Sequence, residues 1–134
     1  MKITKIDHVA IAVSDLDASI HFYENVLGLK FQGTEELPER HVKVAFFECG
    51  DTEIELIQGT SSESMVGKFI QRNGDGLYHL ALRVDDIEKA LPTLHEKGVG
   101  LRDKEPKPGA NHSRIAFLDV KSTGGVIMEL VEKR

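Results

Sequence analysis

The sequence contains an internal repeat, and this repeat constrains the fold more than any other feature. When the chain is shifted by 71 positions without gaps, Asp7–Leu16 aligns with Tyr78–Ile87, and the identities include His8 with His79. The same shift pairs Gln58 with Glu129. A repeated supersecondary unit sets the architecture, so the chain is predicted to consist of two modules of one kind.

Each half has the pattern strand, helix, strand, strand, strand. Short β-branched runs at 6–13 and 77–84 predict the first strands, and apolar residues at helical spacing then predict helices that begin after Ser14 and Asp85. Further strands are predicted over 29–32, 41–48, 53–58, 100–103, 114–119 and 126–131. We therefore expect an α+β fold, in which one domain of residues 1–134 contains two βαβββ modules, about 1–60 and 75–134, joined by a connecting helix at 61–73.

Composition excludes several classes of function. The net charge is -5 with both signs scattered along the chain, so no basic face for nucleic acid is expected. No apolar run approaches the roughly 20 residues of a membrane span, so no membrane partner is expected either. The single cysteine, Cys49, is typical of a reducing compartment, and we expect a cytoplasmic protein.

Four polar side chains occupy matching strand positions. Alternation along a strand places His8 and His79 beside small alanines, and makes Gln58 and Glu129 the strong polar groups on otherwise apolar faces. Each alone has a simpler reading, a hydrogen-bonded core histidine or a carboxylate at a strand edge. Together, two imidazoles, a carboxylate and an amide oxygen suit a divalent metal ion with open coordination positions.

Four segments carry a family resemblance: Ile6–Val13, Asp51–Gln58, Leu77–Ile87 and Lys121–Leu130. Over the whole chain they resemble the methylmalonyl-CoA epimerases of the vicinal oxygen chelate superfamily. The resemblance implies a curved mixed sheet around one metal site, usually in a homodimer. It implies His8, Gln58, His79 and Glu129 as ligands of one divalent ion, which would be cobalt, zinc, manganese, nickel or magnesium.

The implied reaction interconverts (R)- and (S)-methylmalonyl-CoA by removing and returning the proton at C2. Glu129 is the expected acid/base, because a carboxylate beside the metal is placed to exchange protons with the neighbouring carbon. Some family members have a glutamate at the position that we match to Lys43, so the second acid/base is open between Lys43 and Glu48. Candidate contacts to the acyl-CoA substrate are Lys104, Lys107, Arg114 and Lys121.

Three alternatives share the pattern. Glyoxalase I, a lactoylglutathione lyase, uses the same fold and metal-assisted proton transfer, but its metal site usually has a glutamate where we place Gln58. An iron dioxygenase would use His8, His79 and Glu129 as a facial triad. A metal-free protein that sequesters drugs or antibiotics would not need the four polar residues.

Overall fold

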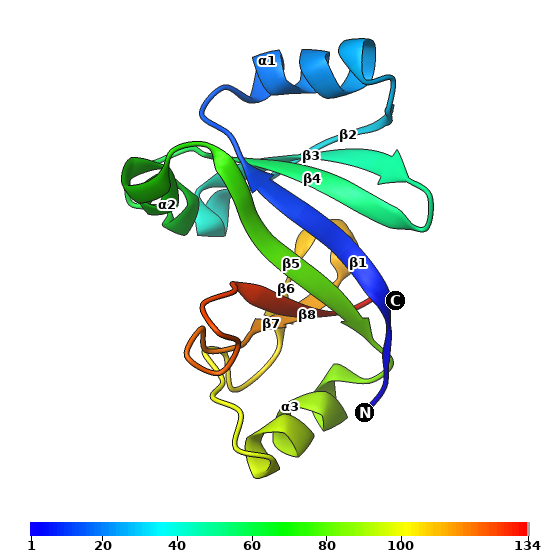
Figure 1. Cartoon of the computed structure of the whole chain (residues 1–134), viewed down its shortest axis with the longest axis vertical. Coiled ribbons are helices and arrows are strands. Elements are labelled where there is room, and N and C mark those ends of the chain that lie inside the picture. Colours follow the sequence, from blue (N-terminus) through cyan, green and yellow to red (C-terminus); the bar gives the residue numbers. More distant parts are fainter. Residues whose placement is uncertain (134) are drawn as a thin grey trace. The chain divides into compact units, whose positions relative to one another are not determined.

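The computed structural model describes residues 1–133, and within them the predicted order of elements occurs twice (Figure 1). The first set is β1 (Ile3–Ala12), α1 (Leu16–His21) continued by a π-helical turn (Phe22–Val26), β2 (Lys30–Leu37), β3 (Val42–Cys49) and β4 (Thr52–Gly59). After α2 (Met65–Asn73), the second set is β5 (Gly76–Val84), α3 (Ile87–Glu96), β6 (Lys107–Pro108), β7 (Arg114–Phe117) and β8 (Met128–Glu132).

The strands form a mixed eight-stranded sheet in the order β2-β3-β4-β1-β5-β8-β7-β6, which confirms the predicted fold class. The pairs β1–β4 and β5–β8 are parallel, and each is formed by the first and last strands of a βαβββ set. The pairs β2–β3, β3–β4, β6–β7 and β7–β8 are antiparallel. No helix among the described residues is long and apolar enough to cross a membrane.

The chain divides into two compact units, residues 8–78 and residues 1–7 with 79–134, so the boundaries fall inside β1 and β5. The extent of the modules as drawn from the sequence, about 1–60 and 75–134, stays a prediction. In the unit of residues 8–78, α1 packs on one face of β1, β3 and β4. Its buried core is Val13, Leu16, Ala45, Phe47 and Leu56.

In the other unit, α3 packs on β5, β7 and β8. The core there includes Val84, Ile87, Leu91, Ala116 and Leu130. The start of β1 is tied into this unit, because the backbone N–H of Lys2 donates to Asp85 Oδ1 at 3.0 Å and the Asp85 N–H donates back to the Lys2 carbonyl at 3.1 Å.

Both helices begin one residue later than predicted. Asp15 Oδ1 accepts the Ala18 N–H at 3.1 Å, and Asp86 Oδ1 accepts the Lys89 N–H at 3.2 Å. An aspartate in extended conformation is a strong N-cap, and it replaces the predicted caps at Ser14 and Asp85.

Two of the predicted short strands also differ. The strand expected at 29–32 extends to Leu37, because a register shift between Phe31 and Thr34 at Gly33, with φ of 102°, lets pairing with β3 continue. The strand expected at 100–103 is reduced to an isolated bridge between Leu101 and Leu118. The Asp103 carboxylate takes the Phe117 N–H at 2.8 Å, in place of a backbone carbonyl.

Candidate metal and proton-transfer site

His8 lies on the face of β1 that is opposite to α1. Ile11 and Val13 of the same strand pack against α1, so alternation places His8 and Ala10 on the other face, which we call the site face. His8 is only 5% exposed. A buried imidazole needs a polar partner, and the partner in this structure is a carboxylate.

That partner is Glu55 of β4, a residue that the sequence reasoning missed. Glu55 pairs with Ala10 in the parallel register, and its Oε2 lies 3.2 Å from His8 Nδ1. It is 5% exposed, so His8 and Glu55 form a buried histidine–carboxylate pair on the site face.

Gln58, by contrast, does not join His8 in this structure. It follows Ile54 and Leu56 by alternation on β4, and these two residues pack against α1. Its Oε1 accepts the Leu16 N–H at 2.7 Å. The Gln58 side chain therefore satisfies the first free N–H of α1 on the face opposite to His8.

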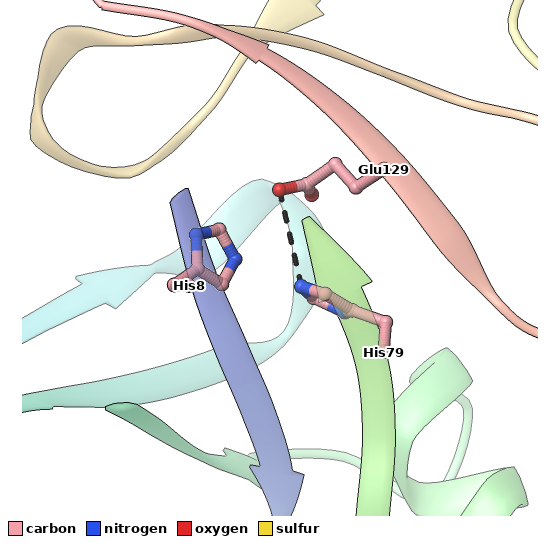
Figure 2. Close-up of side chains that lie close together, drawn as sticks. All are labelled: His8, His79 and Glu129. Carbon is pink, nitrogen blue, oxygen red and sulfur yellow. Dashed lines mark ion pairs between the residues drawn. The ribbon is translucent and has the colours of Figure 1, made fainter. Parts of the chain in front are cut away.

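A second histidine–carboxylate pair lies in the other unit. His79 of β5 and Glu129 of β8 are 8% and 4% exposed, and His79 Nε2 lies 3.8 Å from Glu129 Oε1. Figure 2 shows these two groups facing each other. The carboxylate comes from the strand parallel to that of the histidine, as it does for His8 and Glu55.

The two pairs are equivalent in register. Glu55 lies opposite Ala10, and Glu129 lies opposite Ala81, which is the repeat partner of Ala10. Glu55 and Glu129 are 74 positions apart, whereas the histidines are 71 apart. The segment between the paired residues Ala116 and Leu130 is three residues longer than the segment between Ala45 and Leu56, so a gapless shift pairs Glu129 with Gln58 in place of Glu55.

The donor atoms fit a metal ion. Candidate metal ligands are His8, His79 and Glu129, and a second candidate group is Asp7, His8 and Glu55. Asp7 already binds the guanidinium of Arg83, at 2.8 and 2.9 Å. Glu55 and Glu129 are carboxyl groups buried beside imidazoles, and a divalent cation offsets the cost of burying carboxylates.

The candidates for the second acid/base lie elsewhere. Lys43 pairs with Gln58 and shares the face of Ala45 and Phe47, so it is on the α1 side and not on the site face. Glu48 is exposed near the β3–β4 turn, where its carboxylate lies 3.6 Å from Lys30 Nζ.

The predicted substrate contacts lie in different surroundings, and Lys121 is exposed, with its N–H bonded to Asp119 Oδ1 at 3.0 Å. Arg114 is held by Glu88 and Glu132, and the hydrogen bond that its guanidinium donates to the Glu88 carboxylate raises the pKa of the guanidinium. It therefore anchors α3 to the sheet. Lys104 lines a hollow of about 480 Å³ beside α3, with Leu91 and His95. Lys107 instead lies over the ring of Phe117, which packs against His79.

Comparison with known proteins gives consistent matches. A family model described as Glyoxalase/Bleomycin resistance protein/Dioxygenase superfamily matches residues 7–117. The chain is 39% identical to the uncharacterized protein YqjC of Bacillus subtilis over 130 residues, which are 97% of this chain and 93% of YqjC. It is 37% identical to the human mitochondrial methylmalonyl-CoA epimerase over 127 residues, covering 94% of this chain and 72% of that protein.

Among solved structures, a variant of Streptomyces coelicolor methylmalonyl-CoA epimerase in complex with 2-nitronate-propionyl-CoA superposes with a TM-score of 0.93. It is 35% identical in sequence, and the match covers 98% of this chain and 96% of that one.

Proposed function

Because the chain belongs to the Glyoxalase/Bleomycin resistance protein/Dioxygenase superfamily, we propose that it is a methylmalonyl-CoA epimerase that depends on one divalent metal ion. The proposal takes the reaction from the relatives that carry this name and the chemistry from the residues of this chain. The observation that carries it is the presence of two buried histidine–carboxylate pairs at equivalent positions of the repeat.

The proposed ligands are His8, Glu55, His79 and Glu129, with Glu55 in place of Gln58. Two neutral imidazoles and two carboxylates are a donor set that zinc, cobalt, nickel and manganese all accept. When bound, a divalent ion supplies a Lewis acid that stabilises negative charge developing on the substrate oxygens.

The side chains supply the proton transfer. Glu129 is the proposed base that takes the C2 proton, since its carboxylate is 4% exposed and is held beside His79 rather than solvated. Inversion requires a proton to return on the opposite face of C2. Lys43 is on the α1 side, so the matching carboxylate of the repeat, Glu55, is the proposed second acid.

A glyoxalase I-type lyase activity is the second candidate, and the structure supplies a specific reason for it. Gln58 fits this enzyme poorly as a metal ligand, because the resemblance implies a glutamate at that ligand position. With Glu55 beside His8, the site has the second carboxylate that such an enzyme uses.

Proton exchange tests the proposal. Metal-loaded protein in deuterated water should introduce deuterium at C2 of both (R)- and (S)-methylmalonyl-CoA and interconvert the two, as followed by NMR. Glu129→Gln should lower the exchange rate by about 100-fold or more, because general base catalysis contributes about 10²–10⁴. The control, Glu96→Gln at the exposed end of α3, makes the same amide substitution away from the site and should retain the activity. Absence of exchange together with turnover of a glutathione hemithioacetal would favour the lyase.

We also propose that the protein is a homodimer. The supporting observation is exposed apolar surface in the unit of residues 8–78, where Leu77, Val26 and Leu27 are 73%, 63% and 52% exposed. Light scattering coupled to size exclusion should give twice the chain mass of 14.9 kDa, and a monomer at micromolar concentration would contradict the assembly.

A further inference from the structure

Phe117 carries two cations above its ring. Arg102 Cζ lies 5.3 Å and Lys107 Nζ 5.4 Å from the ring centroid, both within cation–π range. The same ring packs against His79 in an edge-to-face contact, with the two ring centroids 5.5 Å apart. Both cations and a proposed metal ligand therefore contact the same aromatic ring.

Backbone and side-chain bonds fix this arrangement. The N–H groups of Arg102 and Asp103 both donate to the Phe117 carbonyl, each at 3.1 Å. One Asp103 oxygen accepts the Phe117 N–H at 2.8 Å, and the other accepts from Lys107 Nζ at 3.2 Å. The loop that bears both cations is therefore tied at several points to the strand that bears the ring.

The other half of the repeat lacks this positive charge. Lys107 lies opposite Ile115 in the β6–β7 register. The repeat partner of Ile115 is Val44, and the residue opposite Val44 is Glu35. Equivalent positions of the repeat therefore carry opposite charges, and only the half that contains Lys107 has a cation there to attract an anion.

Resting on the proposed function, we propose that Arg102 and Lys107 form an oxyanion subsite that binds the charged part of the acyl thioester and so orients the substrate in the site. Arg102 and Lys107 carry two positive charges, and Asp103, which binds Lys107, carries one negative charge. The three side chains together are therefore positive, although the whole chain has a net charge of -5. The Lys107 side chain is 38% exposed, so its ammonium can reach a ligand while its stem stays over the ring. The oxyanion is either the carboxylate at the reacting carbon or a phosphate of coenzyme A.

Equilibrium binding separates these two sources without requiring turnover. Calorimetry of metal-loaded protein would use propionyl-CoA, which has the phosphates but no free carboxylate, and the N-acetylcysteamine thioester of methylmalonate, which has the carboxylate but no phosphates. Lys107→Met and Arg102→Met should each lower the affinity for one of the two probes by about tenfold, since a charge-assisted hydrogen bond contributes about 1.5–3 kcal/mol. The affected probe identifies the oxyanion.

The matched control is Lys97→Met, which removes the same charge from the exposed end of α3. The subsite would be overturned if Lys107→Met and Arg102→Met weakened the binding of neither probe by more than the control variant does. It would also be overturned if the wild-type protein bound neither probe. Charge-dependent binding without C2 exchange would support the subsite and contradict the epimerase. Unchanged thermal melting of the variants shows that the fold is intact.

Discussion

The most specific prediction follows from the proposal that Glu55, and not Gln58, is a metal ligand. Gln58→Ala removes the 2.7 Å bond to the Leu16 N–H at the start of α1. Loss of such a cap costs about 1 kcal/mol, which for a chain of this size lowers the melting temperature by about 2–6 °C. Metal affinity should change by less than about twofold, because the side chain lies on the face opposite to His8.

Glu55→Gln has the opposite signature. The amide keeps the shape and one oxygen donor but removes a negative charge from the site, where the carboxylate now lies 3.2 Å from His8 Nδ1. At an effective dielectric constant of about 20, two unit charges about 4 Å apart interact by about 4 kcal/mol. Even a third of that value is a tenfold change, so affinity should fall by about 10-fold or more.

Titration of cobalt into chelator-treated protein, followed by absorption and calorimetry, measures the affinity of each variant. Thermal melting in the presence of chelator measures the stability separately. The reasoning is refuted if Gln58→Ala weakens the metal tenfold while Glu55→Gln binds it as the wild type does.

Three further outcomes follow from other contacts. Arg83→Met should destabilise the protein by about 3 kcal/mol in chemical denaturation, because it leaves the fully buried carboxylate of Asp7 without its guanidinium partner; a loss under 1 kcal/mol would contradict this. The hydrogen bond from the Lys2 N–H holds the pKa of Asp85 below its ordinary value. The ionised carboxyl therefore stabilises the folded state at pH values above the unfolded-state pKa of about 3.9, and this stabilisation is lost as the pH falls through the lower folded-state pKa. Asp85→Asn should therefore flatten the fall in stability below about pH 4, and an unchanged profile would count against the contact. A metal ion present at 100 times its Kd stabilises the folded state by about 2.7 kcal/mol, so removing it with a chelator should lower the melting temperature. Identical melting curves with and without chelator would contradict a metal site in the folded protein.

Residue pattern alone predicts most of the architecture, because alternation and helical spacing are local properties. The two βαβββ sets, the helix ends at Gly28 and Gly98 with φ of 75° and 88°, and the site-face histidines are all present in the structure. Helix starts shifted by one residue, since Ser14 and Asp15 are both good caps and only the fold decides between them. Ser14 instead donates its hydroxyl to Asp75, at 3.0 Å.

The sequence pattern did not point to Glu55, the carboxylate that lies beside His8 in the structure. The histidines were found because the repeat is gapless between them, but the carboxylates lie beyond a turn whose length differs between the halves. Pairing of β4 with β1, and of β8 with β5, fixes the correct equivalence. A signal was nonetheless present, since Glu55 stands between Ile54 and Leu56 in an otherwise apolar run.

The central claim is that one metal ion is held by both histidine–carboxylate pairs, and anomalous diffraction at the metal edge tests it most directly. We predict a single peak per chain, with nitrogen ligands from His8 and His79 and carboxylate oxygens from Glu55 and Glu129. A fully loaded crystal with the ion bound by Gln58, or bound away from these four side chains, would contradict the account.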